Sequence, residues 1–273
     1  MRFLQRIRYV LRIANYEWKL SGLSADTNLD VAERTAASKA PLLVARHLDY
    51  LSDVYNLLVK ASSYFNDRPV NSLTPSALVS LALIARMANS LRSISLVARW
   101  GYGADACALA ASTFEFGFEL AHFARDENAS KRWIETEHLT QGVADMRPLI
   151  QAYITAEAIP PDNGKVAKRQ YDMYAKLCAM KHGNPAVTSF HRPADWTKFG
   201  TARLGPDISD YGQKAICFAI TLAGQVSEMA LSVVAKTLLT PGQRTEIEGR
   251  LQPVTRSRLA LNTEARQQWT SFP

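Results

Sequence analysis

The feature that most restricts the fold of this chain is a set of long apolar patterns at helical spacing, with no long run that alternates apolar and polar residues. Thr74-Pro75 has the form of a helix N-cap followed by proline at the first helical position, and Gly101 and Gly103 follow the pattern that starts there. Residues 75–100 therefore predict one helix of about 40 Å. We expect an all-α protein, built as an antiparallel bundle of long helices with an amphipathic N-terminal helix.

The same signals divide the rest of the chain. Further helices are predicted near residues 30–66, 104–125, 129–157, 164–182 and 207–239, with kinks or ends at Pro41, Pro148 and the pair Pro160-Pro161. We expect an N-terminal helical segment over residues 1–70, a bundle core over 71–240 and a basic C-terminal tail over 241–273.

Composition excludes several classes of protein. The chain has 273 residues, of which 47% are apolar, so it can bury a core and is not a disordered protein. Its three cysteines, an odd number, fit a reducing compartment better than a disulfide-stapled secreted module, so we expect a cytoplasmic protein. Two apolar stretches, residues 73–85 and 215–227, are shorter than the about 20 residues that a membrane span needs, and we expect buried helices and no span there.

The first twenty residues form an amphipathic pattern. Their apolar side chains fall within an arc of about 120° on a helical wheel, and four arginines lie on the other side. Such a helix can dock on its own core, on an anionic membrane surface or on another protein, and it resembles some targeting segments. A homodimer or a protein partner bound through this helix is one of our expectations.

Positive charge is concentrated in residues 164–204. The chain carries a formal net charge of +7, and this stretch holds eight basic side chains and only two acidic ones, interleaved with aromatic residues. A site for single-stranded nucleic acid needs cations that bind the phosphates and aromatic rings that stack on unpaired bases. The alternative is a solvated loop that its aromatic residues anchor to the core. The residues that we expect to bind RNA are Arg169, Tyr171, Tyr174, Lys181 and Arg192.

A first candidate site lies on the helix predicted over residues 104–125. This helix is apolar on two sides, as expected for a central helix, and Glu115, Glu119 and His122 share a narrow polar strip between them. Glu119-x-x-His122 and a second Glu-x-x-His at Glu135 and His138 have the spacing of di-iron bundles, but on one helix they lie about 24 Å apart. The other interpretation is a structural row of ion pairs with arginines such as Arg86 or Arg92.

A second candidate site lies at the end of the helix predicted over residues 164–182. Tyr171, Tyr174, Cys178 and His182 share one stripe, and Gly-Asn-Pro after His182 is a strong helix stop. A histidine at a helix C-terminus can simply cap the helix, or it can act as a general acid/base beside a basic, aromatic groove. A Cys178–His182 nucleophilic pair has no third group on the same helix to complete it.

Two passages are similar to a family of uncharacterised bacterial all-helical proteins. The first is Arg92-Ser-Ile-Ser-Leu-Val-Ala-Arg-Trp-Gly101, which leads to Glu115, and the second is Tyr174-Ala-Lys-Leu-Cys-Ala-Met-Lys-His182. More distantly, the second passage resembles the HEPN superfamily, helical and often dimeric proteins that include metal-independent ribonucleases of toxin–antitoxin and phage-defence systems. The HEPN signature is an arginine, four to six residues and a histidine. Here Lys176 takes the arginine position, and lysine lacks the forked geometry of a guanidinium.

The resemblance implies a protein that binds or cleaves RNA without a metal or another cofactor. His182 would act as acid/base, Lys176, Lys181 and Arg169 would hold phosphates, and Glu115 or Glu119 would orient His182. Two alternatives stay open, a non-enzymatic scaffold or partner protein and a metal-dependent helical enzyme built on Glu115, Glu119 and His122.

Overall fold

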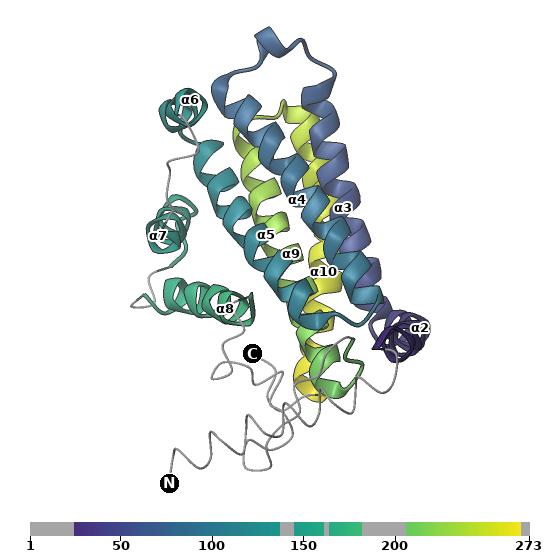
Figure 1. Cartoon of the computed structure of the whole chain (residues 1–273). Coiled ribbons are helices and arrows are strands. Elements are labelled where there is room, and N and C mark those ends of the chain that lie inside the picture. The colour runs from purple at the N-terminus through teal and green to yellow at the C-terminus, as the bar shows by residue number, and fades with distance from the viewer. Residues whose placement is uncertain (1–24, 137–144, 161–163, 182–205, 269–273) are drawn as a thin grey trace.

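A computed structural model describes residues 25–136, 145–160, 164–181 and 206–268. Over these ranges the chain forms nine α-helices, one short 3₁₀ helix and no strand (Figure 1). The all-α bundle predicted from the sequence is confirmed.

Five long helices make up the bundle. They are α3 (Ala45–Asn66), α4 (Pro75–Arg99), α5 (Gly103–Phe123), α9 (Asp210–Thr237) and α10 (Pro241–Gln268). Consecutive helices are antiparallel, from α3 to α5 and again from α9 to α10 (Figure 1). In contrast, α5 and α9 pack side by side in the same direction. Gly103 meets Ala215 at one end and Gly117 meets Val226 farther along, so both helices advance together. The bundle is therefore antiparallel between sequence neighbours and parallel where the two apolar central helices meet.

Four further helices lie around the bundle. The helix α2 (Ala25–Leu43) packs at the end where α3 begins and α4 ends, and the 3₁₀ helix η1 (Val70–Ser72) closes the opposite end (Figure 1). The helices α6 (Glu127–Glu135), α7 (Met146–Ala156) and α8 (Lys165–Lys181) form a layer along the outer side of α5. This layer places α8 directly against the predicted site on α5.

The helix starts follow from local chemistry. The side chain of Thr74 accepts a hydrogen bond from the Ala77 N–H (3.2 Å), and Asp126 and Asp145 cap α6 and α7 in the same manner. Between α4 and α5, Gly101 has φ +81°, a left-handed conformation that costs other residues about 1 kcal/mol or more. The predicted start of α4 at Pro75 and its stop before Gly101 are both found.

Three predicted segments differ in detail. The helix expected over 30–66 is divided into α2 and α3 around Val44, just after Pro41, whose missing N–H removes a helical hydrogen bond. The helix expected over 129–157 is two helices, α6 and α7. Residues 241–268, expected as a basic tail, form α10, which packs on α9 and α3.

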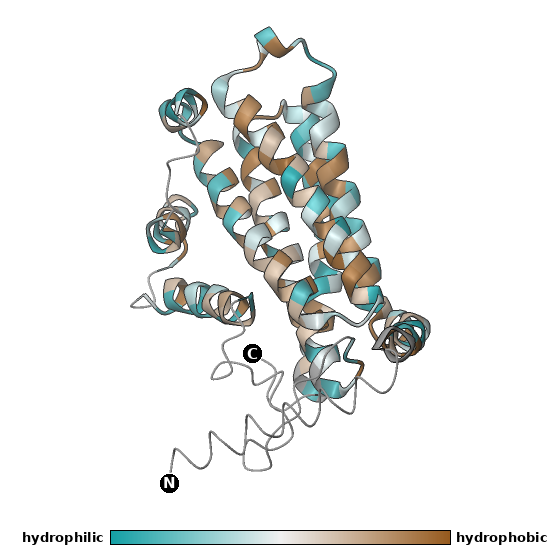
Figure 2. Ribbon diagram, viewed as in Figure 1, coloured by the Kyte–Doolittle hydropathy of each residue, from teal (hydrophilic) through white to brown (hydrophobic). Residues whose placement is uncertain are grey.

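The core is mainly apolar, and it includes a buried polar cluster around Glu228. Figure 2 shows hydrophobic residues along the facing sides of the long helices, and Phe114 and Phe118 of α5 are completely buried. Within this core Glu228 of α9 accepts hydrogen bonds from Tyr50 of α3 (2.5 Å) and from Thr255 and Arg258 of α10 (2.6 and 3.0 Å). The cluster ties three helices together and fully pairs a carboxylate that is only 5% exposed.

Among the residues that the structure describes, two helices are long and apolar enough to cross a membrane if length and composition are the only criteria. They are α4 and the Gly212–Thr237 part of α9, and 50% and 83% of their most apolar windows are buried within the bundle. Core helices of soluble proteins pass the same test, so this is weak evidence, and the absence of a span stays a prediction.

Candidate functional site

The polar strip of α5 is in contact with α8. Leu177 and Met180 of α8 are buried against the core, and the Tyr174 ring stacks on Phe114 with the ring centres 5.3 Å apart. In this position the Tyr174 hydroxyl donates a hydrogen bond of 2.7 Å to Oε1 of Glu115. The structure thus brings together two residues, Glu115 and Tyr174, that the sequence assigned to separate candidate sites.

The groups around this hydrogen bond favour their neutral, protonated forms. Burial raises the pKa of Tyr174, and hydrogen bonds with Cys178 and Glu115 raise it further. Burial also raises the pKa of the Cys178 thiol. At neutral pH the phenol is therefore a donor and the thiol is not a nucleophile, which argues against a reactive Cys178.

Glu119 lies one turn beyond Glu115 on the same side of α5. Its burial, and secondly the negative charge of Glu115, raise the pKa of Glu119 to about 7, although the positive charge of Arg86 acts in the opposite direction. Of the two arginines that we considered as partners, Arg86 is the one that acts on Glu119, and its guanidinium lies 5.7 Å from the centre of the Phe116 ring. A carboxyl with this pKa can take up or release a proton near neutral pH.

The metal interpretation gains no support from the geometry. His122 is half-buried, with its ring next to Phe123 at a centre distance of 5.3 Å. Glu135 ends α6, and His138 lies outside the described residues. Within the described ranges, no group of three or more His, Cys, Asp or Glu side chains is placed to hold a metal ion.

One side of α8 carries a row of basic residues. Lys165, Arg169 and Lys176 fall within an arc of about 40° on the helical wheel. The first two side chains are exposed and Lys176 is half-exposed, whereas the neighbouring Lys168 is paired with Asp172 at 2.5 Å. We call Lys165, Arg169 and Lys176 the basic row of α8.

Lys181 is exposed at the end of α8, and the next residue, His182, lies outside the described residues, as does Arg192. The predicted approach of Glu115 or Glu119 to His182 therefore stays a prediction.

One neighbour of Tyr171 was missed in the sequence. The guanidinium of Arg147, in the first turn of α7, lies 4.5 Å from the centre of the half-buried Tyr171 ring. Tyr171 also meets Tyr174, with the ring centres 6.1 Å apart. Nothing in the sequence near Arg147 signals this contact, because it depends on how α7 and α8 pack together.

The chain matches no protein-family model, no curated protein and no solved structure. Its function has to be argued from its own residues, above all from the contact between α5 and α8.

Proposed function

We propose that the protein binds single-stranded RNA along α8. The observation that carries this proposal is the division of α8 into two faces: Tyr174, hydrogen-bonded to Glu115, anchors one face to α5, and the basic row occupies another. A cationic row on a helix that is fixed in place can contact successive phosphates without first being ordered.

The spacing of the basic row suits an extended strand. Along the helix axis Lys165 and Arg169 are separated by about 6 Å, and Arg169 and Lys176 by about 10 Å. If each cation neutralises one phosphate, the logarithm of the binding constant should fall with the logarithm of salt concentration with a slope of about −2. Tyr171 is half-buried with Arg147 over its ring and Tyr174 beside it, so the proposed contact with RNA rests on the cations of the basic row.

The proposal extends to RNA cleavage without a metal. His182 follows Lys181 directly, and a histidine in that place can remove a proton from a ribose 2′-hydroxyl, while Lys176 balances the phosphate charge. The resemblance of Lys176-x5-His182 to the HEPN signature supports this part of the proposal.

The test is a binding and cleavage assay with labelled single-stranded RNA in EDTA. Replacing all three residues of the basic row with glutamine should remove most binding and bring the salt slope close to zero. A control variant loses the same charge elsewhere, at the exposed residues Arg99, Lys131 and Arg132, and should bind like the wild type. Equal loss in both triple variants, or binding that does not respond to salt, would refute the proposed site.

The same assay separates cleavage from binding. His182→Ala should keep the RNA affinity and lose any cleavage. RNA that stays intact with the wild-type protein but binds with the expected salt slope would refute the catalytic part and leave the binding part in place.

A second function, self-association, is favoured by a different observation. Leu42 is 78% exposed at the end of α2, and Leu96 and Trp100 are exposed at the end of α4, which lies at the same end of the bundle (Figure 1). Large exposed apolar side chains at one end of a bundle can take part in protein–protein contacts. Sedimentation of the wild type and of a Leu42→Lys, Trp100→Glu variant should show association that the variant loses, and a wild type that is monomeric at all concentrations would exclude it.

A further inference from the structure

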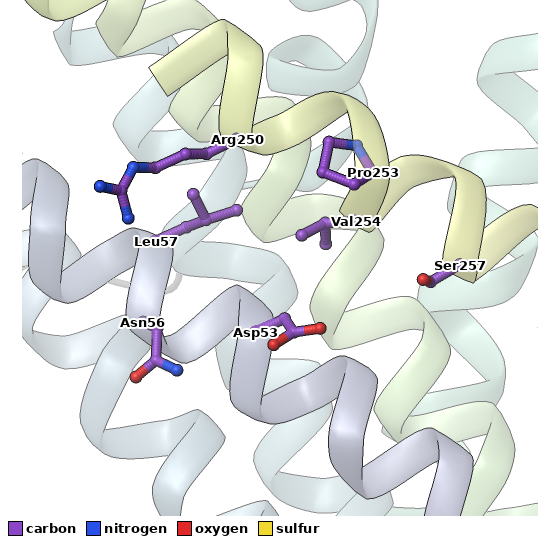
Figure 3. Close-up of a pocket in the computed structure, with 7 residues that line it drawn as sticks. All are labelled: Asp53, Asn56, Leu57, Arg250, Pro253, Val254 and Ser257. Atoms are coloured by element: carbon purple, nitrogen blue, oxygen red, sulfur yellow. The ribbon is translucent and has the colours of Figure 1, made fainter. Parts of the chain in front are cut away.

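A pocket lies between α3 and α10, on a side of the bundle that the proposed RNA site does not use. In Figure 1, α3 and α10 lie on the right of the bundle and α8 lies on the left. Figure 3 shows the residues around the pocket, which has a volume of about 340 Å³, comparable with the lower end of small-molecule sites. Its lining residues are Asp53, Asn56, Leu57, Arg250, Pro253, Val254 and Ser257.

The register of the two helices places these residues. Two links show that α3 and α10 are antiparallel neighbours. Arg46 forms an ion pair with Glu264, and Tyr64 donates a hydrogen bond of 2.6 Å to Glu246. Between these two links the same register sets Asp53 opposite Ser257. The hollow lies between the two helices at this point.

The pocket has opposite charges at its two ends. Leu57 and Val254 are 4% and 7% exposed and form the floor. In Figure 3 the Asp53 carboxylate reaches under Val254 toward Ser257, while the Arg250 side chain extends on the other side of Leu57.

The two charged groups differ in how far they are already paired. Within the described part of the chain Asp53 has no hydrogen-bond or ion-pair partner. Arg250 is 3.0 Å from Glu246, a carboxylate that it shares with Lys60 and Tyr64, so the guanidinium keeps donors for a second anion.

We propose that this pocket binds a small zwitterion with an apolar middle, of the size of a tripeptide. Ser257 and Arg250 are seven residues apart, which puts the two ends of the pocket about 10 Å from each other along α10. An extended tripeptide spans about 10 Å, whereas the charges of a single amino acid lie too close together to reach both ends. Its ammonium group would meet Asp53, its carboxylate Arg250, and its central side chain the floor of Leu57 and Val254.

The test uses the tripeptide Ala-Leu-Ala in calorimetric titrations with the full-length protein at low salt, up to millimolar concentration. Two relatives of the peptide each lack one charge, the N-acetylated form and the C-terminal amide. Each should bind about fivefold more weakly than the free peptide, as expected for one partly exposed ion pair. Free leucine, which cannot span the pocket, should bind weakest.

Variants test the same contacts from the side of the protein. Asp53→Asn should lower the affinity for the free peptide about fivefold. The affinity for the N-acetylated peptide should stay unchanged, because that peptide has no ammonium group to pair with Asp53. Asp49→Asn, one turn away on α3 and outside the lining, is the control and should have no effect. Ser257→Phe should fill the hollow and abolish binding, with Gln252→Phe as the control for an exposed aromatic residue on α10.

No heat of binding from the free peptide would overturn the proposal. So would equal affinity of the free and N-acetylated peptides, or an Asp53→Asn effect that is the same for both. None of these results bears on RNA binding by α8, so the two proposals succeed or fail independently.

Discussion

The close contact between α5 and α9 predicts a specific stability change at Gly117. A Cβ atom added to this residue would lie 2.6 Å from Cγ2 of Val226 and 3.3 Å from the Val226 carbonyl oxygen. Carbon atoms in van der Waals contact are about 3.5–4.0 Å apart, so the two helices or the valine must move. Gly117→Ala gains about 1 kcal/mol of helix propensity, and we expect overpacking of about 2–3 kcal/mol to outweigh it. The net loss in the free energy of unfolding should be about 1–2 kcal/mol.

A second substitution tests whether the loss arises from this contact. Val226→Ala removes two methyl groups from a position that is 2% exposed, and should cost about 2–3 kcal/mol once the cavity is included. In the double variant the methyl group introduced by Gly117→Ala takes part of the space that Cγ2 of Val226 leaves. The double variant should therefore be about as stable as Val226→Ala alone, which is a favourable coupling of about 1–2 kcal/mol.

Urea unfolding followed by circular dichroism gives all four free energies. Gly249→Ala is the control, because a Cβ at this glycine of α10 meets nothing within 4 Å. It should raise stability by up to about 1 kcal/mol. A Gly117→Ala variant as stable as Gly249→Ala, or losses that simply add in the double variant, would show that α5 and α9 do not approach each other as described.

Three further predictions concern buried ionisable groups. Burial lowers the pKa of His47 to about 4 from 6.5, so the unfolded chain binds a proton more readily than the folded one. The free energy of unfolding should therefore fall by up to about 3 kcal/mol between pH 6.5 and pH 4. A His47→Phe variant should lack this part of the pH dependence. The pKa of Glu119 is raised to about 7 from 4.5, so its negative charge destabilises the folded protein at high pH. Glu119→Gln should therefore be more stable than the wild type by about 2 kcal/mol above pH 7 and equally stable below pH 4.5. A stability difference that stays constant across this pH range would contradict the prediction. Arg258→Met leaves the buried charge of Glu228 without its cation and should cost about 3–5 kcal/mol in urea unfolding, whereas the Arg258→Met, Glu228→Met double variant should lose less than the single one.

Local signals explain which parts of the fold could be predicted from the sequence. Thr74, Pro75 and Gly101 define α4 through contacts within a few residues, and the two apolar sides of α5 correctly indicate a central helix. The sequence places a kink or an end at Pro41, and the structure has a division between α2 and α3 just after it; proline alone does not decide between the two.

The helix α10 was missed although the sequence carries its pattern. Its buried apolar residues recur at helical spacing, but basic and polar residues surround them, so the charge pattern alone indicates a basic tail. The buried set of this helix is Ile247, Leu251, Val254, Leu261 and Ala265.

The candidate site depended on packing that no local pattern reports. Glu115 and Tyr174 were each singled out, but their hydrogen bond requires α8 to fold back across α5. The contact of Arg147 with Tyr171 and the shared use of Glu246 by Lys60 and Arg250 likewise join separate helices. For such sites a sequence supplies the chemical groups, and the tertiary structure decides which of them meet.

The two carboxyls on α5 differ in how well their surroundings accept a negative charge. Glu115 is used as the acceptor for Tyr174, but Glu119 is placed where burial and its neighbour oppose its charge. A glutamine there would avoid that cost, and natural sequences tend to break such local rules at functional sites. If α8 binds RNA as proposed, a carboxyl that exchanges a proton near neutral pH, one turn from the residue that anchors α8, would couple pH to that binding. RNA affinity measured across pH 6 to 8 in the wild type and in Glu119→Gln should therefore differ in its pH dependence, and identical profiles would reduce Glu119 to a structural residue.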